Sequence, residues 1–340
     1  MPMIAKPRFL PMRIHVNQAL ARRLPKNHPI IPILENSTSK INSGYHGEVE
    51  VDFHLKYLDD KEHHIFRDLR LSHPLHHFQL DNLILSRKYI LHLEVKNYTG
   101  TLYFDEKLKQ FYQTANNAEK GYQHPLTQLR RQNAQFLDWL AARGFSGLPV
   151  ISQLVFSNPA AVIKTNDAGI RRLVCKADQL KAQLSTVLSS ASVDIMTEKE
   201  QRKLSRLLLK ENLPHKPEVL KNYDIHYDEL RKGIQCPACS AFYMKRKHRF
   251  WVCPHCHHHS SHAHVDALLD YFLLVKPTIT NSEFRDFMCL SSVKTSSNLL
   301  VSMGLPHQGI NKGRVYFAPL NFHSLLEERR IQVRNHPINR

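Results

Sequence analysis

The chain has 340 residues, enough for two or three domains that each have a core of their own. Its 47 lysines and arginines outnumber its 30 aspartates and glutamates, giving a formal net charge of +17 at pH 7. Such an excess favours a polyanionic partner, either nucleic acid or an anionic membrane surface. No apolar run approaches the roughly 20 residues of a membrane-spanning helix, and the start lacks the apolar core of a signal peptide. We therefore expect a soluble, cytoplasmic protein.

Residues 1–40 are basic and carry scattered prolines without clear periodicity. They are predicted to form a basic N-terminal arm or an irregular addition. A helix is then predicted to start near Gly44, because Ser43 can cap it. Its apolar face recurs at helical spacing, at Tyr45, Val49 and Phe53.

Strand-like apolar runs follow this helix. The longer ones, at 65–71, 78–85 and 89–97, predict a three-stranded meander. Two shorter runs, at 102–104 and 110–112, can extend it.

The stretch from Asp81 to Lys96 reads as a hairpin within this meander. Because side chains alternate along a strand, Glu94 and Lys96 project together while Val95 points the other way. Asp81 lies across the hairpin, within reach of Glu94. Two carboxylates and a lysine can hold a hard divalent cation while the ammonium orients a water or a phosphate. A structural ion network among these side chains is the alternative.

A helix and a strand are predicted after the meander. Pro125 fits the first turn of the helix, and Gln128 and Arg131 lie one turn apart on it. Its buried stripe is made of Leu126, Leu129, Phe136, Leu137 and Leu140. Residues 150–157 then read as a buried strand ending in Phe-Ser.

Four motifs in this order resemble the nuclease-related domain (NERD) family of the PD-(D/E)XK nuclease superfamily. They are Gly44-Tyr45-His46-Gly47-Glu48, Asp81…Glu94-Val95-Lys96, His124-Pro125-Leu126-Thr127-Gln128-Leu129-Arg130-Arg131, and the strand at 150–157. The resemblance covers about residues 41–160. It implies an α/β fold with a restriction-endonuclease-like αβββαβ core over residues 41–165.

The same resemblance implies roles for the hairpin residues in phosphodiester hydrolysis. Asp81, Glu94 and the Val95 carbonyl would ligate Mg²⁺ or Mn²⁺, and Lys96 would position or activate the attacking water. Glu48 could steady a second metal or its waters. Alternatively, Glu48 is an exposed glutamate in a first helical turn, where the helix dipole favours it.

Two further side chains are candidates on the Pro125 helix. In the superfamily, a glutamine and a basic residue such as Gln128 and Arg131 often support the metal site or the scissile phosphate. A solvated helix face is the alternative. His92 shares a strand face with Glu94, but the family pattern does not require it.

Residues 166–232 are predicted to be a helical segment and a linker. Helices are expected at 177–188 and 197–209, and Pro214, Pro217 and the polar run after Lys221 suggest the linker.

Residues 233–262 resemble a zinc ribbon of the kind appended to type IA topoisomerases. Cys236, Cys239, Cys253 and Cys256 form two Cys-Pro-x-Cys knuckles. Four thiolates can surround Zn²⁺ tetrahedrally, and a module this short has too small a core without metal. The alternative is free or redox thiols. The histidines at 257–264 could replace a ligand.

The segment between the knuckles combines basic and aromatic residues, which suits phosphate contact and base stacking. The candidate contacts are Lys245, Arg246, Lys247, Arg249 and Trp251. A solvated β-hairpin is the alternative.

Residues 263–325 are similar to a winged helix-turn-helix, and residues 326–340 are predicted to be a basic tail. Helices are expected from 264, from a cap at Asn281 or Ser282, and at 293–303, followed by a wing at 309–317. Exposed side chains on the third helix and the wing could contact DNA. They are Lys294, Asn298, Lys312 and Arg314. A structural or protein-binding helical bundle is the alternative.

Taken together, these features predict a metal-dependent DNA endonuclease or nickase that the zinc ribbon and the winged-helix-like module aim at DNA. A non-catalytic nucleic-acid-binding protein with a nuclease fold is the second hypothesis. An RNA-processing nuclease is the third. No basic amphipathic helix with a continuous apolar face supports membrane binding.

Overall fold

The computed structural model of the chain describes residues 3–56, 63–74, 76–105, 107–188, 193–215 and 217–335. The chain divides into two compact units, each built from two separate stretches. The first unit comprises Met1–Arg8 and Asn42–His215, and the second comprises Phe9–Ile41 and Lys216–Arg340.

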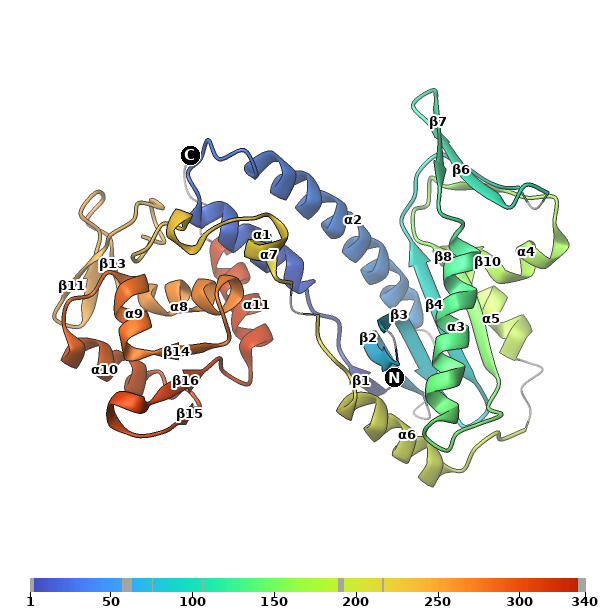
Figure 1. Cartoon of the computed structure of the whole chain (residues 1–340). Helices are drawn as coiled ribbons and strands as arrows, with labels where there is room; N and C mark the ends of the chain where they lie inside the picture. The colour runs from blue at the N-terminus through green and yellow to red at the C-terminus, as the bar shows by residue number, and fades with distance from the viewer. Residues whose placement is uncertain are drawn as a thin grey trace. The chain divides into compact units, whose positions relative to one another are not determined.

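The first unit is a mixed α/β structure with two sheets (Figure 1). Its elements are β1 (Met3–Lys6), the second part of α2 (Ile31–Leu55), β2 (His64–His73), β3 (His76–Leu85), β4 (Ile90–Lys96), β5 (Thr101–Asp105), β6 (Gln110–Ala115), β7 (Ala118–Tyr122), α3 (Pro125–Ala141), β8 (Val150–Phe156), β9 (Val162–Lys164), α4 (Ala168–Leu173), β10 (Val174–Lys176), the 3₁₀ helix η1 (Ala177–Gln179), α5 (Leu180–Leu188) and α6 (Glu198–Lys210).

The main sheet has the order β1-β2-β3-β4-β8-β10. The β2, β3 and β4 strands form the antiparallel meander that the sequence predicts, whereas β8 runs parallel to both β4 and β10. The second sheet has the order β7-β6-β5-β9.

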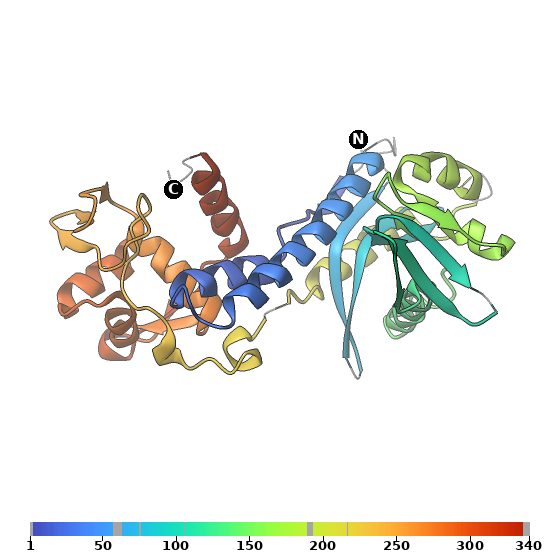
Figure 2. The ribbon, with the colours of Figure 1, turned by 90° about the horizontal axis from the view of Figure 1, so that it is seen from above.

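Side-chain alternation gives the main sheet two apolar faces. One face packs on α3 and α6 through residues such as Ile90 and Phe136. The other packs on α2 and α5 through Leu91, Leu93 and Val51. Figure 2 shows α2 and α3 on opposite sides of the strands. Because each buried large apolar side chain contributes about 1.5–3 kcal/mol, these two layers fix the positions of β3, β4 and α3.

The helix α2 corrects the predicted start near Gly44. It begins at Ile31, so Gly44 and Gly47 lie in its interior. Its buried side carries Gly47 and Val51, whereas Val49 and Phe53 of the predicted apolar face are 40% and 48% exposed. A Cβ at Gly47 would lie 2.5 Å from Ser157 Oγ, so the glycine allows the helix to approach the end of β8 closely.

The segment at 166–215 is part of the folded first unit and does not merely connect two domains. The predicted helices at 177–188 and 197–209 are confirmed by η1 with α5 and by α6, and β10 extends the main sheet. Leu204 and Leu208 of α6 are fully buried against that sheet.

In the residues that the structure describes, the second unit consists mainly of helices, with two small three-stranded sheets. Its elements are α1 (Met12–Arg23), the first part of α2, α7 (Val219–Asn222), η2 (Tyr227–Glu229), β11 (Lys245–Lys247), β12 (Phe250–Val252), β13 (His259–Ser260), α8 (Ala263–Leu274), β14 (Thr278–Thr280), α9 (Asn281–Met288), α10 (Val293–Ser302), β15 (His307–Gln308), η3 (Asn311–Gly313), β16 (Val315–Phe317) and α11 (Phe322–Asn335).

The prediction of a basic N-terminal arm or an irregular addition at 1–40 is wrong. Residues 12–23 form α1, whose apolar side packs in one core with α7, α8 and α11. This core also contains residues of the predicted linker and tail. Its fully or nearly fully buried members include Val16, Ala19, Leu20, Leu24, Val219, Leu230, Leu269 and Leu326.

The last part of the second unit follows the order α8, β14, α9, α10, β15, β16, with β16 between β14 and β15. Helix α9 is capped by Thr280 rather than by Asn281 or Ser282, through a reciprocal capping box with Glu283. The predicted helix at 293–303 is confirmed by α10. Residues 311–313 of the expected wing form η3 between the two strands. Within the described residues, no helix combines the length and apolarity that crossing a membrane requires.

Candidate functional site

Asp81 lies where β3 and β4 separate. Their pairing ends at Asn82 and Leu93, which leaves the next part of β4 without a β3 partner. The Asp81 side chain takes that place, because its Oδ2 accepts a hydrogen bond from the Val95 N–H at 2.9 Å. The hairpin register therefore brings the carboxylate to the strand that carries Glu94.

Glu94 and Lys96 project from β4 toward α3, where Gln128 meets them. Lys96 Nζ donates to Glu94 Oε1 at 2.6 Å and to Gln128 Oε1 at 3.1 Å. Gln128 Nε2 donates to the same Glu94 oxygen at 2.6 Å. Glu94 is 1% exposed, and its Oε2 is buried without a hydrogen-bond partner. The predicted strand alternation thus brings these three side chains together.

The environment of this cluster shifts two pKa values. Burial and the neighbouring Glu94 raise the pKa of Asp81 to about 7, despite the Lys96 ammonium and the Val95 hydrogen bond. Burial lowers the pKa of Lys96, but the carboxylates of Glu94 and Asp81 outweigh it and leave the pKa above its ordinary value. Lys96 is therefore an ammonium at neutral pH.

Glu48 lies on α2 but does not join Glu94. Its Oε2 accepts a hydrogen bond from Arg8 Nη1. Burial and the Asp81 carboxylate raise the pKa of Glu48 to about 9, against the opposing effect of Arg8. Arg8 also forms ion pairs with Asp52 and Asp68. It was not identified from the sequence as a candidate site residue.

The carboxylate cluster fits a hard divalent cation in its chemistry. An unpartnered buried carboxylate oxygen is costly, and a cation on Glu94 Oε2 would remove that cost. Asp81 supplies a second carboxylate beside it. This arrangement can also place the Lys96 ammonium close to an anionic substrate.

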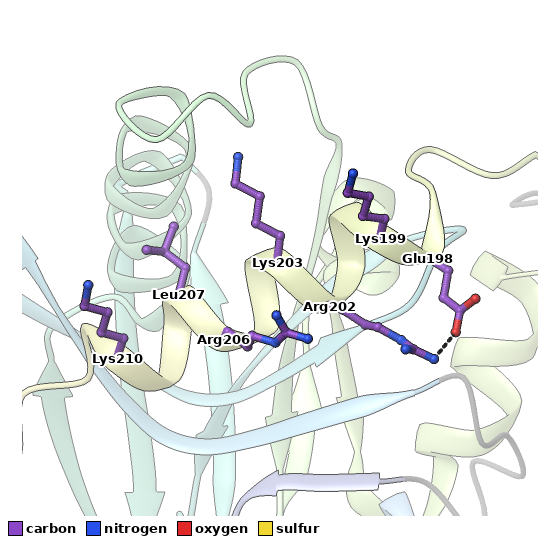
Figure 3. Close-up of a pocket in the computed structure, with 7 residues that line it drawn as sticks. All are labelled: Glu198, Lys199, Arg202, Lys203, Arg206, Leu207 and Lys210. Carbon is purple, nitrogen blue, oxygen red and sulfur yellow. Dashed lines mark hydrogen bonds and ion pairs between the residues drawn. The ribbon is translucent and has the colours of Figure 1, made fainter.

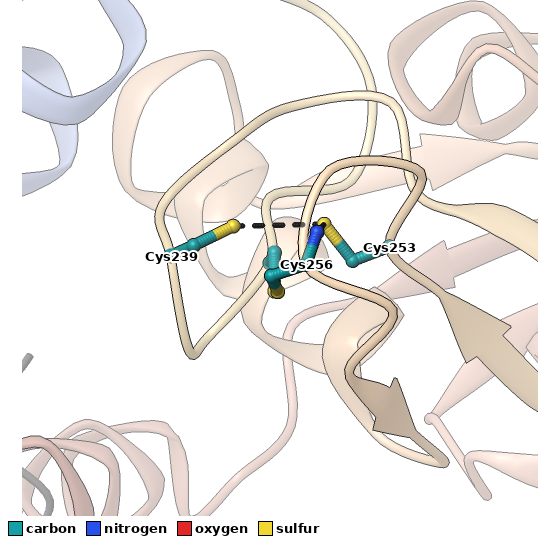
Figure 4. Close-up of side chains that lie close together, drawn as sticks. Cys239, Cys253 and Cys256 are labelled. Carbon is teal, nitrogen blue, oxygen red and sulfur yellow. Dashed lines mark hydrogen bonds between the residues drawn. The ribbon is translucent and has the colours of Figure 1, made fainter.

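The four predicted cysteine ligands lie together in the second unit. Among the residues that the structure describes, they are the only group of three or more histidine, cysteine or acidic side chains whose ligand atoms all lie within 4.8 Å of one another. Figure 4 shows Cys239 and Cys253 directed at each other, with their sulfurs 3.5 Å apart. Cys236 and Cys256 are 3.7 Å apart. Four converging thiol groups are compatible with one tetrahedral Zn²⁺.

Two side chains near the cysteine cluster, Trp251 and His264, do not have the roles that the sequence predicts. Trp251 is 1% exposed and donates through Nε1 to His264 Nδ1 at 3.0 Å, so it presents no surface for base stacking. Phe250 is 48% exposed instead. Burial lowers the pKa of His264 to about 4, and its bond to Trp251 keeps it out of the cysteine group.

Most of the other predicted DNA contacts are accessible. Arg131 is exposed on α3, away from the hydrogen bonds of Gln128. The exposed predicted contacts of the second unit are Lys245, Lys247, Arg249, Lys294, Asn298 and Lys312. Arg246 and Arg314 are half-buried, and the Arg246 guanidinium lies 5.2 Å from the Trp251 ring centre.

Helix α6 carries a basic face that was not expected from the sequence to be functional. Figure 3 shows its cationic side chains, which lie one to four residues apart along the helix. They are Lys199, Arg202, Lys203, Arg206 and Lys210. Arg202 pairs with Glu198, whereas Lys199, Arg206 and Lys210 form no ion pair with any described residue. The helical periodicity of lysine and arginine in 199–210 was the available signal.

Comparison with known proteins supports the resemblance found in the sequence. Residues 43–157 match the family model described as the nuclease-related domain. No curated protein and no solved structure matches the chain. The matched range contains Glu48, Asp81, Glu94, Lys96 and Gln128, but it ends before the cysteine cluster.

Proposed function

We propose that the chain is a metal-dependent nuclease that hydrolyses phosphodiester bonds in DNA. The observation that carries this proposal is the convergence of Asp81, Glu94, Lys96 and Gln128 inside the range that matches a nuclease-related domain. Two carboxylates and an ammonium at the end of a strand pair suit a substrate with a charged phosphate. The order α2, β2, β3, β4, α3, β8 supports a restriction-endonuclease-like αβββαβ core.

The residues that would hold the cation are Asp81, Glu94 and the Val95 carbonyl. Mg²⁺ or Mn²⁺ bound there supplies Lewis-acid chemistry to the phosphate. Lys96 is protonated at neutral pH, so it would orient a water or neutralise phosphate charge rather than remove a proton. Gln128 would fix the orientation of both Glu94 and Lys96 through its two hydrogen bonds.

The second unit would deliver the nuclease to DNA. The cysteine cluster is compatible with a structural Zn²⁺ and would present Lys245, Lys247 and Arg249 to phosphates. The succession α8, β14, α9, α10, β15, β16 has the order of a winged helix, with Lys294 and Asn298 exposed on α10. The net charge of +17 and the basic face of α6 support a polyanionic partner.

The test is cleavage of supercoiled plasmid by the full-length, zinc-loaded chain with Mg²⁺, Mn²⁺ or EDTA. Wild type is compared with Asp81→Ala, Glu94→Ala and Lys96→Ala, and DNA binding is measured in parallel. The proposal predicts metal-dependent nicking that all three substitutions abolish while binding persists.

Two outcomes of that experiment favour the other hypotheses. Tight DNA binding by wild type without cleavage under any metal supports a non-catalytic DNA-binding protein. Metal-dependent cleavage of an RNA substrate, with plasmid left intact, supports an RNA nuclease.

A further inference from the structure

Among the described residues of the first unit, Arg8 is the buried cation with the most hydrogen bonds to other side chains. Its side chain is 2% exposed, although it belongs to a segment that reads as an arm in the sequence. All three guanidinium nitrogens donate hydrogen bonds. Nε and Nη2 bond the two oxygens of Asp52 at 2.9 and 3.3 Å, and Nη1 bonds Glu48 as well as Asp68 at 2.9 Å.

Arg8 also holds the strand that carries Asp81. Its Nη2 lies 3.0 Å from both the Asp81 carbonyl oxygen and Asn82 Oδ1. A single side chain therefore joins α2, β2 and β3 at the point where β3 separates from β4. The Asp81 carboxylate projects from the residue whose carbonyl Arg8 fixes.

The carboxylates near Arg8 are engaged by cationic side chains of the protein itself. Glu48, Asp52 and Asp68 each accept a hydrogen bond from Arg8. Arg67 adds a second guanidinium, with its Nε 3.1 Å from Asp52. Lys6 lies beside this cluster, and its Nζ donates to the Asp68 carbonyl oxygen at 3.0 Å. Among the described residues, no buried oxygen of these three carboxylates lacks a hydrogen-bond partner.

The neighbouring cluster is not filled in this way. Lys96 pairs with only one oxygen of Glu94, with its Nζ 2.6 Å from Oε1. Among the described residues, Glu94 Oε2 is the only buried carboxylate oxygen without a hydrogen-bond partner. The unused ligand atom therefore lies on the Asp81–Glu94 side.

We infer that Arg8 is a built-in cation that fills the acidic cluster of Glu48, Asp52 and Asp68, so that the centre takes a single divalent ion at Asp81 and Glu94. Glu48 then serves Arg8 and is not a metal ligand. A metal ion could replace Arg8 only by leaving a guanidinium buried without its carboxylates, which is strongly unfavourable. Arg8 is a positioning residue, acting through β3 on Asp81. This inference rests on the proposed metal-dependent function.

The test counts Mn²⁺ ions bound by the full-length chain after its cysteine site has been loaded with zinc. Titration calorimetry and the electron paramagnetic resonance signal of free Mn²⁺ give the stoichiometry without any substrate. Wild type should bind one Mn²⁺, and Glu94→Gln should bind none. Arg8→Met should bind two, because it frees three carboxylates, whereas Arg130→Met, an exposed arginine on α3, should still bind one.

A second variant tests the inference even if Arg8→Met does not fold. Glu48→Gln can still accept the hydrogen bond from Arg8, so it should leave the Mn²⁺ stoichiometry unchanged and the Kd within about 3-fold of wild type. Loss of a metal ligand or its support would instead weaken binding about 10–100-fold.

The possible failures are distinguishable. Two Mn²⁺ ions on wild type, weaker binding by Glu48→Gln, or a folded Arg8→Met that still binds one ion would each overturn the role of Arg8 while leaving a metal centre in place. No Mn²⁺ on wild type would overturn the proposed metal-dependent function itself, and this inference with it.

Discussion

Two buried carboxylates differ in how their charge is compensated. Glu94 has one oxygen shared by Lys96 and Gln128 and another without a partner. Asp270 of α8, in the second unit, has both oxygens engaged by arginines. The distances are 2.8 Å to Arg22, 2.9 Å to Arg23 and 2.8 Å to Arg329. Because an uncompensated buried charge is costly, Glu94 has the character of a ligand site and Asp270 that of a structural one.

Asp270 should make the stability of the fold depend on pH. Burial alone would raise its pKa, but Arg22, Arg329 and Arg23 outweigh burial and hold the pKa well below its ordinary value. This interaction stabilises the fold above the unfolded-state pKa of about 3.9 and is lost as the pH falls toward the folded-state pKa. Asp270→Asn should cost about 3–5 kcal/mol of unfolding free energy near neutral pH and less in acid.

Urea unfolding of the full chain between pH 3 and pH 7 measures this effect. Asp228→Asn is the control, because that side chain is 91% exposed. An Asp270→Asn variant as stable as the control at pH 7 would show that the arginines do not depend on this carboxylate.

The sequence predicts the cluster around Glu94 better than its surroundings. Asp81, Glu94 and Lys96 follow from hairpin register and strand alternation, which are local rules. Arg8 lies 73 residues before Asp81 and belongs to no recognisable pattern, so only the fold reveals it. The prediction that Trp251 contacts nucleic acid was wrong, because the sequence of a short strand with apolar and basic residues does not show which face of the strand packs on α8.

At the scale of elements, the sequence predicts helices and strands that have a strong hydrophobic periodicity. It does not predict the residues at which they begin and end. The meander, α3, β8 and α10 have their predicted positions within a few residues. Helix α2 starts 13 residues before Gly44, because Pro32 is tolerated in a first turn and tertiary packing offsets two interior glycines. Gly47 allows α2 to approach Ser157 closely and does not mark the end of a helix.

The cysteine knuckles should depend on metal. Cys236 and Cys253 are buried in the same core as Trp251, so loss of a metal would loosen that core. Cys256→Ser should reduce the zinc content from one ion per chain to none after dialysis against a chelator, with a red shift of Trp251 fluorescence. Cys289→Ser, which removes a cysteine outside the cluster, is the control. Full zinc retention by Cys256→Ser, measured by atomic absorption, would exclude this four-cysteine site.

The basic face of α6 should contribute to DNA affinity through phosphates. Replacing Lys199, Lys203, Arg206 and Lys210 by glutamine should weaken binding and reduce the slope of log K against log salt by about 0.9 for each duplex phosphate that is no longer neutralised. The control changes the same charge at the exposed residues Lys107, Lys120, Arg171 and Arg172. Fluorescence anisotropy at several salt concentrations measures both sets. Equal slopes for the two sets would assign no special role to α6.

At the scale of the whole molecule, each unit combines an N-terminal piece with a distant part of the chain. Residues 1–8 supply Arg8 to the first unit, and residues 9–41 supply α1 to the core of the second. The predicted domain boundary at residue 40 therefore does not separate an arm from a nuclease domain. Experiments on function need the full chain, since a truncation at residue 40 would remove parts of both units.

The most direct test of a metal-dependent nuclease compares two lysine substitutions on neighbouring parts of the same hairpin. Lys96 contacts Glu94 and Gln128, whereas Lys88 is exposed in the turn between β3 and β4. The rate at which supercoiled plasmid becomes open-circular is measured with Mg²⁺ or Mn²⁺ and with EDTA. We predict nicking by wild type and Lys88→Met that requires the metal, and none by Lys96→Met. Wild-type nicking that persists in EDTA, or Lys96→Met nicking at the wild-type rate, would contradict a metal-dependent nuclease centred on Lys96.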